Sequence, residues 1–206
     1  MAELTLYSNP QSRGLIAQWM LAELGRPYEL VNLDYGTSMK APDYLKINPM
    51  GKVPALVHRA ADGERVVTEA AAICAYVAEA FPEAGLLPDS KGRAAYFRWL
   101  FFCAGPVEAA IMDRHLKVEV SDEQRMMVGY GRYDEAVDVL EGAMPDGDGW
   151  IAGDRFTAAD VYVGSTVVWG LDFGTLPERA GMRAYADRLK ARPAYRQVFP
   201  EAPSGG

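Results

Sequence analysis

The segment Gly51-Lys-Val-Pro-Ala-Leu56 is well suited to bind a ligand through its backbone. Pro54 stands at the mouth of a strand-like stretch, and a proline there belongs at an edge because it has no N–H to give to a sheet. A cis peptide bond before Pro54 would leave the N–H and C=O of Val53 free. The segment therefore predicts a place where an extended ligand pairs with the chain. An edge strand with a trans proline is the alternative.

A second candidate segment is Val67-Thr-Glu-Ala-Ala-Ala-Ile73, where a strand passes into a helix. The first turn of a helix carries unpaired N–H groups, which attract an anion such as a ligand carboxylate. Glu69 lies at this start, where its charge also favours the helix dipole. Two roles therefore stay open for Glu69: contact with a ligand, or stabilisation of the helix end.

The segment Gly153-Asp-Arg-Phe-Thr-Ala-Ala-Asp160 predicts a structural motif. The Thr157 side chain can cap the N–H three residues on, while Asp160 reaches back to the Thr157 N–H. This reciprocal arrangement is a capping box. It starts a core helix and binds no ligand.

The metal-ligating and redox residue types are few and scattered. Cys74 and Cys103 lie in apolar, helix-like stretches, and their spacing fits neither a zinc site nor a Cys-x-x-Cys pair. The two histidines, His58 and His115, are far apart and have no cysteine or carboxylate cluster beside them. We therefore expect buried, inert thiols and no metal site.

The composition is that of an ordinary globular protein of 206 residues, half of them apolar. With 21 basic and 28 acidic residues the net charge is −7, which disfavours nucleic acid and anionic membranes as partners. No apolar run approaches the roughly 18 residues of a membrane-spanning helix. The first residues lack the features of a signal peptide. We expect a protein that is not exported.

The elements that must position these residues change in type along the chain. In the first half, alternation and turn signals predict βαβαββα, with the last two strands antiparallel. The expected strands are 4–7, 28–33, 53–58 and 65–67, and the expected helices are 13–24, 43–47 and 68–80.

After residue 81 only helical patterns follow, which predicts two domains. We expect a first domain at 1–81, a linker at 82–90 and an all-helical domain at 91–206, with a loose tail at 200–206. Pro106 should bend the first helix of the second domain. The expected helices are 91–118, 122–144, 157–172 and 178–191.

The order and spacing of these features resemble the cytosolic glutathione transferase superfamily over nearly the whole chain. The residues that carry the resemblance are Asn48 to Leu56, Thr68-Glu69 at a helix start, and Gly153 to Asp160. Bacterial-type members look closest. The resemblance implies an α/β plus all-α fold, with a thioredoxin-like glutathione-binding domain built on a mixed sheet and then an all-helical domain.

The resemblance also implies roles for residues of the first domain. Val53, before a cis Pro54, should pair through its backbone with the cysteinyl part of glutathione. Glu69 should bind the γ-glutamyl ammonium, and Lys52 should approach a glutathione carboxylate. The family usually has serine after this Glu, where it binds the γ-glutamyl carboxylate. Here that position is Ala70, so we expect weaker glutathione binding through the backbone N–H alone.

For catalysis, the resemblance assigns thiolate stabilisation to a hydroxyl near the first helix. Ser12 matches the serine of serine-type members, and an N-cap is its alternative role. Tyr7, near the tyrosine of tyrosine-type members, is the second candidate, followed by Ser8, Asn9 and Arg13. This loop has no cysteine, which argues against thiol-transfer chemistry.

The implied function is a cytoplasmic, homodimeric detoxification enzyme that joins the glutathione thiolate to a small hydrophobic electrophile. Glutathione is the co-substrate, and no metal or bound cofactor is expected. Two alternatives stay open: a ligand-binding protein of the same fold without turnover, or a glutathione-dependent peroxidase, dehalogenase or isomerase.

Overall fold

The computed structural model describes residues 2–200 and divides into two compact units. Among the described residues, the first unit holds 2–87 together with 192–200, and the second holds Pro88–Ala191. The segment after 191, which the sequence analysis assigned to the helical domain, thus groups with the first unit. Apart from Pro200, the tail expected at 200–206 lies outside the described residues.

The first unit is built on a mixed sheet of four strands in the order β2-β1-β3-β4. The β1 strand pairs with β2 in parallel, while the β1–β3 and β3–β4 pairs are antiparallel. The predicted βαβαββα order and thioredoxin-like class are confirmed. The strands are β1 Leu4–Ser8, β2 Glu29–Asn32, β3 Ala55–Ala60 and β4 Gly63–Thr68.

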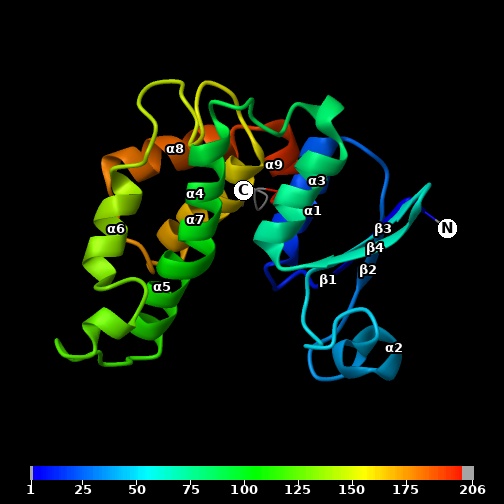
Figure 1. Ribbon diagram of the computed structural model, residues 1–206, viewed down its shortest axis with the longest axis horizontal. Helices are drawn as coiled ribbons and strands as arrows, with labels where there is room; N and C mark the ends of the chain where they lie inside the picture. The colour runs from blue at the N-terminus through cyan, green and yellow to red at the C-terminus, as the bar shows by residue number, and fades with distance from the viewer. Residues whose placement is uncertain (1, 201–206) are drawn as a thin grey trace, which may run out of the picture. The chain divides into compact units, whose positions relative to one another are not determined.

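Two helices, α1 (Gly14–Leu24) and α3 (Ala70–Ala80), lie together over one face of this sheet (Figure 1). The short helix α2 (Pro42–Leu45) and the 3₁₀ turn η1 (Ser38–Lys40) lie on the other side (Figure 1). A further 3₁₀ turn, η2 (Pro82–Ala84), follows α3. Because side chains alternate along a strand, Leu4 and Leu6 of β1 are fully buried, whereas Tyr7 joins the smaller core around α2.

Helix α1 ends where its sequence predicts. Gly25 takes a left-handed conformation, with φ of 71°, and its N–H donates to the Leu21 carbonyl. Glycine is the residue that adopts this cap without a steric penalty.

A short helix that the sequence analysis missed, α9 (Pro193–Val198), packs on α1. Arg192 donates two hydrogen bonds of 2.7 Å to the Glu23 carboxylate, and the Tyr195 ring meets Trp19 edge to face at 5.0 Å. The only sequence signal was Pro193, since proline favours the first position of a helix. This contact makes the end of the described chain part of the first unit.

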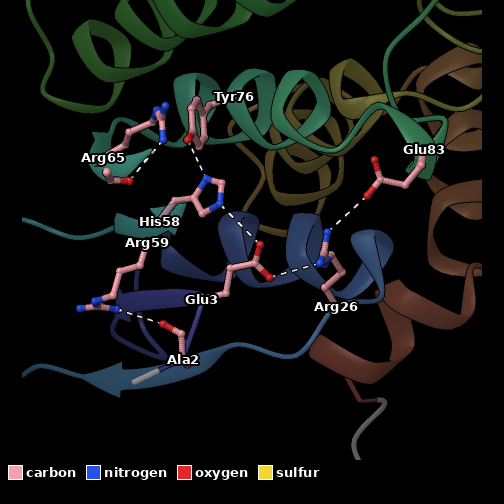
Figure 2. A network of polar contacts seen from close by, with 9 residues as sticks. Ala2, Glu3, Arg26, His58, Arg59, Arg65, Tyr76 and Glu83 are labelled. Carbon is pink, nitrogen blue, oxygen red and sulfur yellow. Dashed lines mark hydrogen bonds and ion pairs between the residues drawn. The ribbon is translucent and has the colours of Figure 1, made fainter. Parts of the chain in front are cut away.

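At one end of the sheet, a polar network joins β3 to α3 and to the start of the chain (Figure 2). His58 Nδ1 lies 2.7 Å from the Tyr76 hydroxyl, and its Nε2 faces Glu3 at 3.7 Å. Glu3 in turn pairs with Arg26, which also reaches Glu83 (Figure 2). These charged groups pair with one another at the end of β3 away from Val53 and Pro54, so their role is structural.

The second unit is helical, as predicted, but its elements are shorter than the sequence suggested. Pro106 lies in a π-helical turn between α4 and α5, at the place where the sequence analysis expected a bend. The helix expected at 122–144 is wrong over its first half, where the chain forms a 3₁₀ turn at Arg125–Met127 and Gly131, with φ of 68°, precedes α6. The elements are α4 Arg93–Phe102, η3 Cys103–Val107, α5 Glu108–His115, η4 Arg125–Met127, α6 Tyr133–Glu141, α7 Ala158–Asp172 and α8 Ala180–Lys190. No helix in residues 2–200 is long and apolar enough to cross a membrane.

The start of α7 is the predicted capping box, with one further partner. The fully buried Asp160 accepts hydrogen bonds from the Thr157 N–H and hydroxyl, from the Ile151 N–H and from the Tyr185 hydroxyl. Burial raises the pKa of the Asp160 carboxyl, and these hydrogen bonds lower it in part. Asp160 therefore ties α7 to the preceding loop and to α8.

We expect Asp160→Asn to lower the free energy of unfolding by about 2–4 kcal/mol, because the new amide group faces buried donors. Urea unfolding measures this loss. The control is Asp172→Asn on the same helix, where an exposed ion pair with Lys190 is lost at a cost below about 1 kcal/mol. Equal losses in the two variants would contradict the role given to Asp160.

Candidate functional site

The register of the sheet brings the predicted site segments together. Tyr7 pairs with Ala55, and Ala55 pairs with Thr68. The loop after β1, the Val53-Pro54 segment before β3 and the Glu69-Ala70 start of α3 therefore leave the sheet at the same end. Segments as far apart in the sequence as those of Tyr7 and Ala55 are thereby placed side by side, because β1, β3 and β4 are hydrogen-bonded in that order.

The loop after β1 is held by Asn9. Pro10, which lacks an N–H, follows at once and the strand stops. The Asn9 side chain continues the contact with the segment after β2 by donating to the Leu33 carbonyl at 2.7 Å, and its oxygen accepts the Gln11 N–H at 2.8 Å. Asn9 is buried, so this loop is anchored rather than loose.

Ser12 lies in this loop two residues before α1 begins. Its hydroxyl donates to the Asn9 carbonyl at 2.7 Å and accepts the Gly14 N–H at 2.9 Å. The residue at the cap position is Arg13, which makes no side-chain capping bond. Ser12 thus has the helix-start role that the sequence left open, and its half-buried hydroxyl remains a candidate for ligand contact.

The other hydroxyls of this region are less suited to that contact. Ser8 is fully buried, and its hydroxyl accepts a hydrogen bond from Gln18 at 3.0 Å. Tyr7 packs its ring against Tyr44, with centroids 5.4 Å apart, within the core below the sheet. Of the hydroxyl candidates, Ser12 is therefore the one on an anchored loop outside the core.

A clamp of two donors fixes the segment before β3. The Tyr44 hydroxyl and the Asn48 side-chain amide both donate to the Lys52 carbonyl, at 2.6 and 2.7 Å. Desolvation raises the pKa of Tyr44 to about 12, so this hydroxyl keeps its proton at neutral pH. The next peptide bond, Val53-Pro54, is cis.

Val53 is half-buried, and its backbone groups are available to a ligand. Within residues 2–200, no backbone or side-chain hydrogen bond uses the Val53 N–H or carbonyl. Polar backbone groups at a protein surface normally find a partner, so an extended ligand can pair there as a further strand would.

Glu69 is held in an unusual conformation at the start of α3. Its φ is 65° and its ψ is 120°, which non-glycine residues adopt rarely. This is why α3 begins at Ala70, two residues later than predicted. The exposed Glu69 side chain makes no capping hydrogen bond. A strained backbone that presents an uncommitted carboxylate is typical of binding sites.

Ala70 is the buried first residue of α3, so the unpaired N–H groups of the first turn begin beside Glu69. The Lys52 carbonyl accepts the two hydrogen bonds described above, but the exposed Lys52 side chain forms no hydrogen bond or ion pair within residues 2–200. The site therefore offers an anion-binding helix start, a carboxylate for a cation and a free lysine for a second anion.

The described residues contain no cluster of three or more His, Cys, Asp or Glu arranged to hold a metal ion. Both cysteines are free and buried. Burial raises the pKa of the Cys74 thiol, and it raises that of Cys103 to about 12, so both thiols stay protonated and unreactive.

The fold is a thioredoxin-like unit followed by a helical unit, and the unpaired Val53 backbone beside a helix start could pair with an extended ligand. Residues 2–79 match the model of the glutathione S-transferase N-terminal domain, and residues 92–199 match that of the C-terminal domain. The chain therefore belongs to the glutathione S-transferase family of enzymes.

Named relatives and solved structures agree with this assignment. A glutathione S-transferase, GST-4.5, of Xanthomonas campestris is 30% identical over 91% of this chain and 93% of its own. A maleylacetoacetate isomerase of Pseudomonas aeruginosa is 31% identical over 80% of this chain and 79% of its own. A glutathione transferase homologue from Sulfitobacter, solved with bound glutathione, has a TM-score of 0.74 and 28% identity, covering 97% of this chain and 98% of that one.

The loop after β1 depends on the missing side chain at Gly14. A Cβ added there would lie 2.1 Å from Ser8 Oγ and 2.9 Å from Ser12 Oγ. We expect Gly14→Ala to lower the free energy of unfolding by about 1–3 kcal/mol, because the buried Ser8 has no room to move.

Chemical denaturation measures this effect. The control is Gly129→Ala, whose added Cβ meets nothing within 4 Å and should change stability by less than about 0.5 kcal/mol. A Gly14→Ala variant as stable as the control would show that the two hydroxyls are not confined by this glycine.

Proposed function

We propose that the chain binds glutathione at the end of the sheet where Val53, Glu69 and Ser12 meet, and joins its thiolate to a small hydrophobic electrophile. One observation carries this proposal: the sheet register places the unpaired Val53 backbone beside the strained, uncommitted Glu69. This pair offers hydrogen bonds to a peptide and a carboxylate to its ammonium group.

The residues would divide the tripeptide among them. The Val53 N–H and carbonyl pair with the cysteinyl unit, held by Pro54 behind them. The Glu69 carboxylate takes the γ-glutamyl ammonium, and the N–H groups at Ala70 take the γ-glutamyl carboxylate. Lys52, exposed on the same segment, takes the glycyl carboxylate.

The chemistry requires the glutathione thiol, whose pKa resembles the cysteine value of about 8.5, to be largely ionised at neutral pH. The Ser12 hydroxyl donates a hydrogen bond to the sulfur and so stabilises the thiolate; Tyr7 is the alternative donor. The thiolate then attacks the electrophile, a C–S bond forms, and the leaving group departs or the product takes up a proton. Catalysis comes from proximity and from activation of the nucleophile.

A second candidate function is isomerisation, which the 31% identical isomerase relative favours. An isomerase adds the thiolate and later expels it, so glutathione is recovered. A transferase consumes one glutathione for each product. Measuring the glutathione consumed per substrate turned over separates the two. A protein that binds the ligand without turnover would neither consume glutathione nor convert the substrate.

The setting that we propose is a homodimer in the cytoplasm with a role in detoxification. The resemblance supports this setting, and the two buried, reduced cysteines suit a reducing compartment.

We expect Glu69→Ala to weaken glutathione binding at least about tenfold, since a charged hydrogen bond contributes about 1.5–3 kcal/mol. Stability should hold, because the side chain makes no capping bond in the fold. Calorimetric titration measures the affinity, with Glu79→Ala, an exposed carboxylate at the other end of α3, as the control. Unchanged affinity in Glu69→Ala would place the γ-glutamyl unit elsewhere.

We expect Ala70→Ser to tighten glutathione binding about tenfold by adding a hydroxyl donor for the γ-glutamyl carboxylate. The neighbouring Ala71→Ser is the matched control and should bind as the wild type does. The same titration measures both. Equal affinity in the two variants would mean that the carboxylate does not reach the start of α3.

A further inference from the structure

We infer that Asn9 is a positioning residue for the Ser12 hydroxyl. Before a ligand binds, this hydroxyl donates to the Asn9 backbone carbonyl; when glutathione binds, it turns and donates to the thiolate sulfur instead. The inference rests on the proposed function, because it concerns the same sulfur. It assigns to Asn9, through its backbone and its side chain, a role in setting the pKa of the bound thiol.

The resting position follows from donor and acceptor chemistry. A carbonyl can only accept, so the 2.7 Å contact of Ser12 Oγ with the Asn9 carbonyl uses the hydroxyl proton. A backbone N–H can only donate, so the 2.9 Å contact with Gly14 N uses a lone pair of the same oxygen. The hydroxyl is thus fully oriented before any ligand binds.

Turning the Ser12 hydroxyl away from the Asn9 carbonyl costs little free energy. The Asn9 carbonyl also accepts the Ser12 N–H, at 3.1 Å, so it keeps a partner when the hydroxyl turns away. The Gly14 N–H continues to donate to Oγ after the turn. An oxygen that accepts such a bond is a stronger donor, because hydrogen bonds in a chain polarise one another.

The Asn9 side chain keeps this carbonyl in place. Its amide donates to the Leu33 carbonyl at 2.7 Å and accepts the Gln11 N–H at 2.8 Å, so both ends of the buried side chain are fixed. From the other side of the loop, Tyr35 donates to the Gln11 carbonyl at 3.1 Å. The loop is therefore braced on both sides of the residue whose carbonyl orients Ser12.

The proton balance of the step is simple. Glutathione releases its thiol proton to water, Ser12 keeps its own proton covalently bound, and its O–H turns from the Asn9 carbonyl to the sulfur. The titratable or charged side chains on the segments around this point are Tyr7, Arg13, Tyr35, Lys52 and Glu69. They are the same in every variant below, so they do not account for differences between variants.

The test is a pH titration of the glutathione thiolate bound to the whole protein, followed by its ultraviolet difference absorbance. It compares wild type, Ser12→Ala, Asn9→Ala and the double variant. The control is Ser165→Ala, which removes a buried hydroxyl that donates to the Val161 carbonyl in the second unit. Calorimetry gives the glutathione affinity of each variant separately.

We expect Ser12→Ala to raise the pKa of the bound thiol by about one unit toward its free value. Asn9→Ala should produce most of the same rise, and the double variant should add nothing to Ser12→Ala, because the two residues act through one hydroxyl. The control should leave the thiol pKa unchanged. Affinity should stay within about threefold throughout, since the binding groups are elsewhere.

The opposing results are distinct. A thiol pKa that Ser12→Ala raises and Asn9→Ala leaves unchanged would overturn the inference alone, as would additive rises in the double variant. A thiol pKa that Ser12→Ala leaves unchanged would overturn the assignment of Ser12 as well. No saturable glutathione signal in the wild type would overturn the proposed function. If Asn9→Ala does not fold, Asn9→Ser decides the matter, since a serine hydroxyl can still accept the Gln11 N–H, loses the amide donor to Leu33 and adds no charge beside the sulfur.

Discussion

The register of three neighbouring strands is the constraint on which the candidate site depends. Tyr7 pairs with Ala55, and Ala55 pairs with Thr68. This register brings three segments to one end of the sheet: the loop after β1, the segment before β3 and the start of α3. A slip of one residue in any of these pairs would turn the strand over and bury the wrong side chains, so the hydrophobic core and the site are specified together. Towards the other end of β3, the network around His58 joins this strand to Tyr76 of α3 and to Glu3 through polar contacts (Figure 2).

When a site binds its ligand mainly through backbone groups, the residue types at its positions can vary. The groups that we assign to peptide binding are the N–H and carbonyl of Val53 and the first N–H groups of α3. The clamp from Tyr44 and Asn48 to the Lys52 carbonyl, together with the strained φ of Glu69, holds this backbone in place. The resemblance leads us to expect serine at the position of Ala70, and the backbone groups of the proposed site do not depend on that side chain. What the chain loses is a single hydroxyl donor.

Sequence reasoning reached the order of the elements and the capping box at Asp160, because each has a local signal. The thioredoxin-like class and the cis bond before Pro54 came from the family resemblance, since the residues alone left a trans proline open. Proline, glycine and hydroxyl positions mark turns and helix ends. It missed α9, whose packing on α1 rests on the long-range Glu23–Arg192 pair. It extended the helix before α6 through Gly131, whose left-handed conformation, with φ of 68°, does not continue a helix. The roles of Asn9 and of the Glu69 backbone were out of reach, since both arise from contacts between segments that only the folded sheet brings together.

The most direct test of the account is to follow the backbone amide resonances of isotope-labelled protein while glutathione is added. The account predicts saturable shifts of the Val53, Ala70 and Ala71 amides that fit one dissociation constant, with the Ile151 and Thr157 amides of the second unit unmoved. Shifts that saturate elsewhere while Val53 and Ala70 stay still would contradict it, because the ligand would then not use the edge and helix start that the strand register brings together.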